Sequence, residues 1–210
     1  DTIDTKYLVT CCGMLSAPMN DLFPGQNSFK GRIFHTSRWP HEFVELAGKR
    51  VGVVGNGATG IQVIQTIASE VEQLKVFIRT PQYVLPMINT PYGPEEISAY
   101  KARFEEFCQN LPNTFTGFEY DFEHIWADST PEQRIQVLED VYQDGSLKLW
   151  LASFGEMFFD AGVSEEISEF VRKKMRARLK DERLCELLIP KDYGFGTHRV
   201  PLESGYLEAY

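Results

Sequence analysis

Three glycines within six residues could hold the phosphates of a dinucleotide. They follow the G-x-G-x-x-G pattern, as Gly55-Asn56-Gly57-Ala58-Thr59-Gly60. In this pattern the first glycine allows a tight turn after a strand, the second lets the backbone approach a pyrophosphate, and the third lets helix and strand pack closely. N–H groups at the start of the following helix then face the phosphates. Because glycine-rich turns are common, the pattern indicates a dinucleotide site only between a strand and a helix.

Arg79 and Thr80 follow the next apolar run and could select the dinucleotide. An NAD site would place Asp or Glu about 20 residues beyond the loop, where the carboxylate binds the ribose 2′-hydroxyl. A guanidinium at that place can instead pair with a 2′-phosphate, through two parallel hydrogen bonds where the geometry allows. Arg79 could also be an ordinary surface residue, but that reading leaves the missing acid unexplained. The sequence therefore favours NADP(H) over NAD(H).

Residues 29–40 contain a histidine, a tryptophan and further aromatic side chains at close spacing. Taken singly, each could simply pack, and His35 could be a hydrogen-bonded core histidine. No residue of this segment indicates a mechanism from first principles. Only the spacing of the whole set distinguishes it from an ordinary packed segment.

The glycine loop lies between a predicted strand and a predicted helix. An apolar run over 49–54 ends directly in the loop, and 58–69 carries apolar residues at helical spacing. A further apolar run over 74–78 predicts the next strand, and the run over 6–13 predicts a short buried strand nearer the start. Strand, loop, helix and strand within about 30 residues form the βαβ unit that the pattern requires. We therefore predict an α/β fold, a Rossmann-like dinucleotide-binding domain.

Residues 94–188 have a helical pattern and predict a helical insertion into this α/β unit. One helix is expected to begin at Thr130 with a capping box, and another at Ser164. The basic run 172–178 could bind an acidic partner, but acidic residues flank it on both sides, which favours a solvated helix face. Met and aromatic side chains of 147–159 are expected in a core or in an interface between domains.

Composition narrows the class of protein. The 210 residues carry a formal net charge of −9, which argues against a nucleic-acid partner, because such a partner needs a basic face. No apolar run approaches the ~20 residues of a membrane span, and no secretory signal is visible. The four cysteines form no C-x-x-C pair, which favours reduced thiols and a cytoplasmic location. The four histidines are scattered, so we predict no metal site.

The spacing of the 29–40 segment resembles a known fingerprint. It matches F-x-G-x-x-x-H-x-x-x-W-[P/D], the signature of the type I Baeyer–Villiger monooxygenases, and the resemblance extends over essentially the whole chain. The stretches 7–18, 76–83 and 194–199 are each similar to segments of that family. The matching fingerprint residues are Phe29, Gly31, His35, Trp39 and Pro40.

The resemblance implies roles for individual residues. Arg79 and Thr80 correspond to ligands of the NADP(H) 2′-phosphate, and Arg199 to the active-site arginine, whose permanent charge could stabilise an oxyanion. Arg199 could instead form an ion pair with Glu203 or another neighbour. Members often carry Lys before that arginine; here it is His198, and a neutral imidazole adds no charge for the phosphate.

In that family, NADPH reduces bound FAD, and the reduced flavin and O2 convert a ketone to an ester or lactone. This chain has no glycine-rich FAD loop ahead of residue 55. We therefore expect it to be part of an incomplete two-dinucleotide-binding-domain flavoprotein, inactive by itself. The predicted division is 1–18 as the end of the FAD-binding domain, 19–48 as a linker with the fingerprint, 49–93 as the NADP-binding βαβ unit, 94–188 as the helical insertion and 189–210 as the return to the NADP domain.

Two other functions stay open at this point. A flavin-dependent N- or S-oxygenase shares the beginning of the fingerprint, although Trp39 and the 194–199 stretch count against it. A non-catalytic module that only binds NADP(H) would carry the same glycine loop. A disulfide reductase is excluded, because it would need a redox-active C-x-x-C pair.

Overall fold

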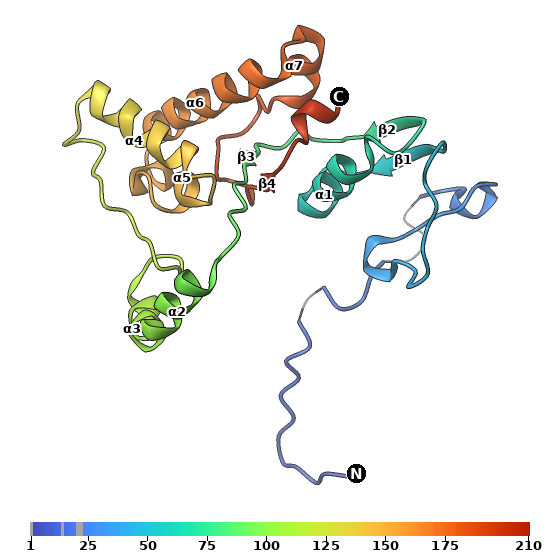
Figure 1. Cartoon of the computed structure of the whole chain (residues 1–210), viewed down its shortest axis with the longest axis horizontal. Helices are drawn as coiled ribbons and strands as arrows, with labels where there is room; N and C mark the ends of the chain where they lie inside the picture. The colour runs from blue at the N-terminus through green and yellow to red at the C-terminus, as the bar shows by residue number, and fades with distance from the viewer. Residues whose placement is uncertain (1, 14, 20–22) are drawn as a thin grey trace. The chain divides into compact units, whose positions relative to one another are not determined.

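The structure, a computed structural model, describes residues 2–13, 15–19 and 23–210. It divides into two compact units, Asp1–Glu45 and Leu46–Tyr210 (Figure 1). The predicted segments 1–18 and 19–48 each include positions outside the described residues, namely 1, 14 and 20–22. The five-part division of the chain stays a prediction.

The first unit contains little regular structure. Its described residues form two 3₁₀ helices, η1 (Gln26–Ser28) and η2 (Thr36–Arg38). The strand predicted over 6–13 is wrong: these residues form no strand, and their side chains are exposed. An apolar run becomes a strand only when a neighbouring strand accepts its backbone hydrogen bonds, and none of the described residues does so here.

The second unit begins with the predicted βαβ arrangement. Strand β1 (Arg50–Val54) leads into helix α1 (Ala58–Ile67), which returns to strand β2 (Gln73–Phe77). The two strands pair in parallel, with Val54 opposite Phe77 at their carboxyl ends. Ile61 and Ile64 of α1 are fully buried and join the core together with the half-buried face of the sheet. The predicted α/β dinucleotide-binding architecture is confirmed at this unit.

Helices make up most of the chain between 94 and 188 (Figure 1). The longest, α6, lies in the core through buried residues that include Ile167, Val171 and Met175. Helices α2 and α3 contact each other and bury none of their residues. The bounds are α2 (Pro94–Ala102), α3 (Phe104–Asn110), η3 (Leu111–Asn113), α4 (Pro131–Gln143), α5 (Lys148–Leu151), η4 (Gly155–Phe158), α6 (Ala161–Leu179) and α7 (Glu182–Leu188).

Helix starts were predicted with mixed success. The capping box at Thr130 is confirmed, because its hydroxyl accepts from the Gln133 N–H while the Gln133 side chain accepts from the Thr130 N–H. The start at Ser164 is wrong: α6 begins three residues earlier, at Ala161. The carboxylate of Asp160 accepts from two backbone N–H groups there, and Asp is among the strongest N-cap residues.

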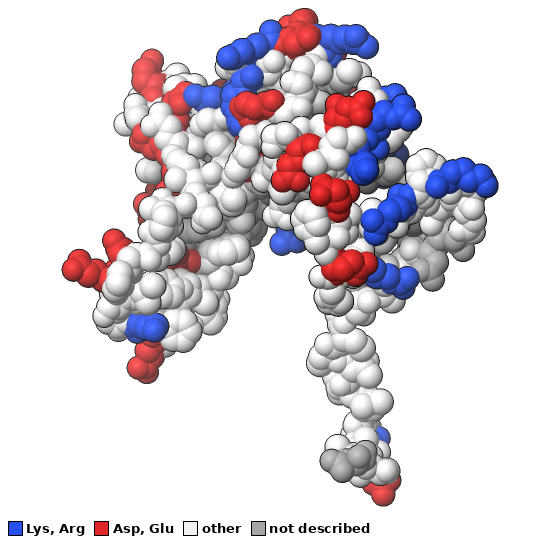
Figure 2. Space-filling model, turned by 45° about the vertical axis from the view of Figure 1, so that its right-hand side comes forward, with Lys and Arg blue, Asp and Glu red and all other residues white. Residues whose placement is uncertain are grey.

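Acidic and basic side chains lie next to one another over much of the face drawn in Figure 2. In the basic run of α6, Arg172, Lys174, Arg176 and Arg178 all pair with carboxylates of this chain. Their side chains range from largely buried to half-exposed, so part of the run lies in ion pairs at the edge of the core. The predicted solvated face is therefore only partly correct.

A short parallel pair joins the chain's last part to the core. Strand β3 (Leu85–Pro86) pairs with β4 (Leu202–Glu203), and η5 (Leu207–Ala209) follows. Phe154 and Met157 are buried, and Trp150 and Phe158 pack half-buried against the core, so the core expected for 147–159 forms, although Phe159 is exposed. The core thus connects α1, α6 and the segment after 193.

Candidate nucleotide-binding site

The glycine loop occupies the carboxyl end of β1 and the start of α1. Gly55 has a φ of 98°, a value that L side chains rarely adopt, and its N–H donates to the Phe77 carbonyl over 2.9 Å. Gly57 is the N-cap of α1, and no side chain caps this end. The N–H groups of the first turn, which includes Ala58 and Thr59, are therefore open to a ligand, and the helix dipole favours an anion there.

The other two glycines test whether a dinucleotide fits. A Cβ at Gly60 would lie 2.4 Å from the Gly55 carbonyl oxygen, so only glycine permits this packing of helix against strand. A Cβ at Gly57 would meet nothing within 4 Å, so no packing inside the protein explains that glycine. Open space over an exposed backbone is what a pyrophosphate needs, and these residues fit the group.

Arg79 and Thr80 lie at the same edge of the sheet, just beyond β2. Arg79 is exposed, and Thr80 is half-buried. The Arg79 side chain lines a cavity of about 430 Å³ whose walls also include Val76, Ile78 and Lys191. Lys191 pairs with Glu186, and both Glu186 and Asp192 line the cavity as well. The cavity offers apolar walls and charges of both signs beside Arg79.

Hydrogen bonds hold the segment 190–196 against the end of β2 and against α6. The Tyr193 hydroxyl donates to the Pro81 carbonyl over 2.7 Å, and the Tyr83 hydroxyl donates to the Tyr193 carbonyl over 3.1 Å. Burial raises the pKa of Tyr193 to about 12, so the phenol stays a donor. Arg172 donates to the Pro190 carbonyl, and the Phe195 N–H donates to Ser168. The segment is therefore fixed at four points.

His198 and Arg199 follow this fixed segment directly. The His198 ring lies 4.3 Å from the Tyr193 ring, centroid to centroid, and both His198 and Arg199 are exposed. The ion pair considered for Arg199 with Glu203 does not form, because Glu203 pairs with Arg178. Among the residues that the structure describes, neither Arg199 nor Arg79 has a carboxylate within ion-pair distance.

The fingerprint lies in the first unit and forms a small local structure. The Phe29 ring covers Gly31, where a Cβ would lie 2.6 Å from it. The His35 Nδ1 accepts from the Ser37 N–H over 3.2 Å and thereby caps η2. The Trp39 ring, just before Pro40, lies 5.3 Å from that of Phe34. Close spacing in the sequence thus corresponds to one capped turn with an aromatic pair.

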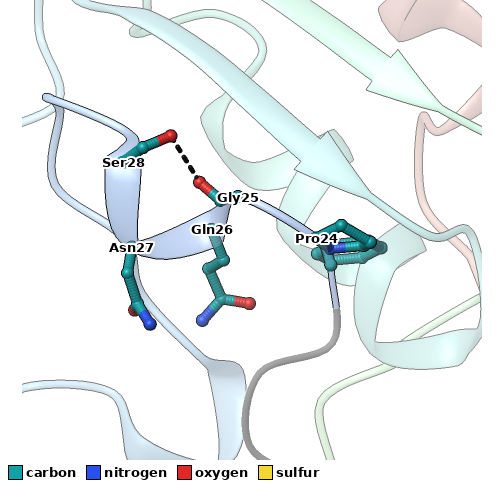
Figure 3. A pocket seen from close by; sticks show the side chains of 6 residues that line it. Pro24, Gly25, Gln26, Asn27 and Ser28 are labelled. Carbon is teal, nitrogen blue, oxygen red and sulfur yellow. Dashed lines mark hydrogen bonds between the residues drawn. The ribbon is translucent and has the colours of Figure 1, made fainter.

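We assign no function to a hollow that lies just before the fingerprint in the sequence. It is lined by six consecutive residues, Phe23–Ser28, around η1, and Ser28 Oγ donates to the Gly25 carbonyl over 2.7 Å (Figure 3). None of the predicted site residues lines it. A single turn of chain without charged side chains offers no converging groups for a ligand.

Sequence reasoning missed the residues that support the site. Tyr193, Tyr83 and Gln65 form hydrogen bonds with groups far away in the chain, so no local spacing marks them. Within the described part of the chain, no three His, Cys, Asp or Glu side chains are grouped so that they could hold a metal ion. No helix among those residues is long and apolar enough to cross a membrane.

Known proteins resemble this chain in sequence. A family model described as flavin-binding monooxygenase-like matches residues 4–129. The acetone monooxygenase (methyl acetate-forming) of Gordonia sp. strain TY-5 is 70% identical over 210 residues, which are 100% of this chain and 39% of that protein. A 2-oxo-Δ3-4,5,5-trimethylcyclopentenylacetyl-CoA monooxygenase of Pseudomonas putida is 35% identical over 217 residues, with 100% of this chain and 40% of that protein covered.

Solved structures also resemble the chain. A crystal structure of OTEMO in complex with FAD and NADP matches with a TM-score of 0.91 at 36% identity. The match covers 95% of this chain and 38% of that one. The chain thus spans about two fifths of the length of the relatives it matches.

Proposed function

The chain belongs to the flavin-binding monooxygenase-like family, whose model covers more than half of it, and from this premise we propose that it is the NADP(H)-binding part of an FAD- and NADPH-dependent Baeyer–Villiger monooxygenase. One observation carries the proposal: an open glycine loop and Arg79, which has no ion pair among the described residues, lie at the same carboxyl edge of a parallel βαβ unit. Ligands of open α/β sheets bind at this edge.

Different residues of this chain would bind different parts of the dinucleotide. Residues 55–60 would hold the pyrophosphate through backbone N–H groups at the start of α1. Arg79 and Thr80 would bind the 2′-phosphate, with the adjoining cavity of about 430 Å³ available to the adenosine. His198 follows the segment that Tyr193 fastens to Pro81, its ring lies beside that of Tyr193, and it would complete this end of the site.

Arg199 is proposed as the catalytic residue. When bound, FAD, NADPH and O2 supply the oxygenation chemistry, in which one oxygen atom enters a ketone beside its carbonyl carbon and the other leaves as water. The guanidinium of Arg199 would stabilise the negative charge that develops on oxygen during this step. Its lack of an ion pair in the described chain leaves the charge available, and the four-point anchoring of 190–196 restricts its position.

The name of a relative suggests the first substrate to test. The 70% identical relative is named for acetone and methyl acetate, so acetone is the first ketone to test. The product class is an ester, or a lactone from a cyclic ketone. Nucleic acid and membrane have no part in the proposal.

A cytoplasmic location fits the four free thiols and the need for NADPH, and cell fractionation with an antibody would test it.

Nucleotide binding is tested by calorimetric titration of the 210-residue chain with NADP⁺ and NAD⁺. We expect saturable binding of NADP⁺ and binding of NAD⁺ that is weaker by about tenfold or more, since charge-assisted hydrogen bonds to the 2′-phosphate are lost. Equal affinities, or no binding of either, would contradict the nucleotide assignment.

Catalysis is tested in a chimera. The chain replaces the matching segment of the Gordonia relative, so that the parts of that protein which this chain lacks are supplied. We expect acetone-dependent oxidation of NADPH with formation of methyl acetate. The variant Arg199→Ala should still allow flavin reduction by NADPH but yield no ester, whereas Arg183→Ala, an exposed arginine of α7 in no described ion pair, should behave as the parent.

The chimera also separates the other candidate functions. Oxidation of an amine or a thioether, with no ester from any ketone, would favour the N- or S-oxygenase. A correctly folded chimera that binds NADP⁺ and FAD but oxidises no substrate would favour a non-catalytic NADP-binding module.

A further inference from the structure

The short stretch 196–200 is closed at both ends on one segment of the chain, residues 81–86. Before its first end, the Tyr193 hydroxyl donates to the Pro81 carbonyl over 2.7 Å. After its second end, the Leu85 N–H donates to the Pro201 carbonyl over 3.1 Å, and the pairing of β3 with β4 continues from there. A side chain thus makes the first attachment to this segment, and the backbone makes the second.

Both parts of the chain that are joined in this way carry residues of the proposed site. The stretch 196–200 contains His198 and Arg199, and the segment 81–86 comes directly after Arg79 and Thr80. The two attachments therefore fix where the imidazole and the guanidinium of 198–199 lie relative to the residues proposed for the 2′-phosphate.

Two opposed hydrogen bonds form the attachment at Tyr193. Besides the bond from Tyr193 to Pro81, the Tyr83 hydroxyl donates to the Tyr193 carbonyl over 3.1 Å. Tyr83 is buried in the core, and its ring lies edge-on to that of Tyr193 with 5.3 Å between the centroids. The bonds from Arg172 and Ser168 fasten the same segment to α6 instead. The Tyr193 hydroxyl can therefore be removed while the segment stays attached to the core.

Pro81 transmits the restraint toward Thr80. A proline ring fixes its own φ and restricts the preceding residue to extended conformations, so holding the Pro81 carbonyl also limits the backbone of Thr80. The ring of Tyr193 meanwhile lies 4.3 Å from that of His198, centroid to centroid. One side chain thus contacts both His198 and the residue that follows Thr80.

We propose that Tyr193 is a positioning residue that sets the cofactor preference: its hydroxyl, through Pro81, keeps His198 beside the residues that bind the 2′-phosphate of NADP(H). This inference rests on the proposed function. Because the bond acts next to Thr80 and not at the glycine loop, it favours NADP(H) and has little effect on NAD(H), which has no 2′-phosphate.

Calorimetric titrations of the 210-residue chain with NADP⁺ and NAD⁺ test this role in Tyr193→Phe. The variant keeps the ring beside His198 and removes the hydroxyl that binds Pro81, while the pairing of β3 with β4 remains. The control is Tyr142→Phe, at a half-buried tyrosine of α4 whose ring packs on that of Phe170. Denaturant unfolding checks that both variants are folded.

Tyr193→Phe should lower the NADP⁺ affinity by about three- to tenfold, the size of one hydrogen bond, and change the NAD⁺ affinity less than about twofold. Tyr142→Phe should leave the preference for NADP⁺ as in the wild type.

Hydrogen exchange without nucleotide measures the positioning directly. The amide hydrogen of Thr197, which lies between the two attachments, should exchange about threefold faster or more in Tyr193→Phe, because one attachment is lost. The amide hydrogen of Leu85 belongs to the attachment that remains and should exchange as in the wild type.

Unchanged NADP⁺ affinity or unchanged exchange at Thr197 in Tyr193→Phe would overturn the inference and leave the proposed function intact, because the wild type still prefers NADP⁺. Equal losses for the two nucleotides, or a variant that does not fold, would show a structural role only. An equal loss of preference in Tyr142→Phe would show that the effect is not specific to this attachment. A wild type that binds neither nucleotide, or both equally, would overturn the proposed function along with the inference.

Discussion

The glycine loop and the fingerprint are both short, glycine-containing motifs, but the structure supports them differently. The loop lies between a strand and a helix of its own unit, and its Asn56 is buried. The fingerprint forms one capped turn whose larger side chains stay exposed, with Phe29 at 63% and Trp39 at 41% of their surface. The loop has a backbone with open space over Gly57 and an uncapped helix start, while the fingerprint has only local order.

This difference shows which kind of motif can be interpreted physically. Every glycine of the loop has a reason that can be stated as an angle, a clash or an open approach. For the fingerprint, the structure shows the Phe29 ring over Gly31 and the cap that His35 provides, and neither of them specifies chemistry. The loop therefore supports a function by itself, whereas the fingerprint supports one through family membership.

The largest effect is expected from Gly60→Ala. The added Cβ would lie 2.4 Å from the Gly55 carbonyl oxygen, so helix α1 and the loop must move apart. We expect NADP⁺ binding to be lost and the free energy of unfolding to fall by about 1–3 kcal/mol, as for other overpacked sites. Calorimetric titration and denaturant unfolding measure the two effects.

Gly57→Ala is the matched control for that change. Its Cβ meets nothing within 4 Å, so the stability should stay within about 0.5 kcal/mol of the wild type. NADP⁺ binding should still weaken, since the methyl group occupies the open approach of the pyrophosphate. If both variants lose stability equally, the distinction drawn between packing and ligand approach is wrong.

Arg79→Ala is expected to have the next largest effect. Loss of the guanidinium should weaken NADP⁺ by about ten- to hundredfold, the range of one or two charge-assisted hydrogen bonds, and leave NAD⁺ almost unchanged. Lys75→Ala, at an exposed basic residue of β2 shortly before Arg79, should change neither affinity. Equal losses for NADP⁺ and NAD⁺ in Arg79→Ala would remove the argument for the 2′-phosphate.

Local patterns predicted the βαβ unit and its loop because the apolar runs and the glycines that indicate them lie close together in the sequence. The capping box at Thr130 was predictable for the same reason. The strand over 6–13 failed because a strand also needs a partner, which no local pattern reveals. Tyr193 and Pro81 are separated by 112 positions, so no local sequence pattern could predict their hydrogen bond. The same applies to Glu203, whose partner is Arg178 rather than the nearer Arg199.

His198→Lys should strengthen the nucleotide end of the site moderately. A lysine would add a full charge just after the segment that Tyr193 fastens to Pro81. Because an exposed ion pair contributes about 0.2–1 kcal/mol, we expect NADP⁺ affinity to rise up to about fivefold, with NAD⁺ unaffected. His198→Gln, which adds no charge, is the control. A rise in NAD⁺ affinity, or none in NADP⁺ affinity, would show that position 198 does not face the 2′-phosphate.

The smallest effect is expected from His35→Ala in the fingerprint. Its Nδ1 accepts from the Ser37 N–H and lies 2.8 Å from the Ser37 hydroxyl, so the change removes the cap of a three-residue helix. Loss of an exposed cap is worth about 0.5 kcal/mol, which corresponds to about twofold faster exchange of the Ser37 amide hydrogen. Thr36→Ala, in the same turn and without a described side-chain bond, should leave the rate as it is. NADP⁺ affinity should be the same in all three proteins, because the strand and helix that flank the glycine loop belong to the loop's own unit. A loss of NADP⁺ affinity in His35→Ala alone would break the comparison, since it would make the fingerprint part of the nucleotide site.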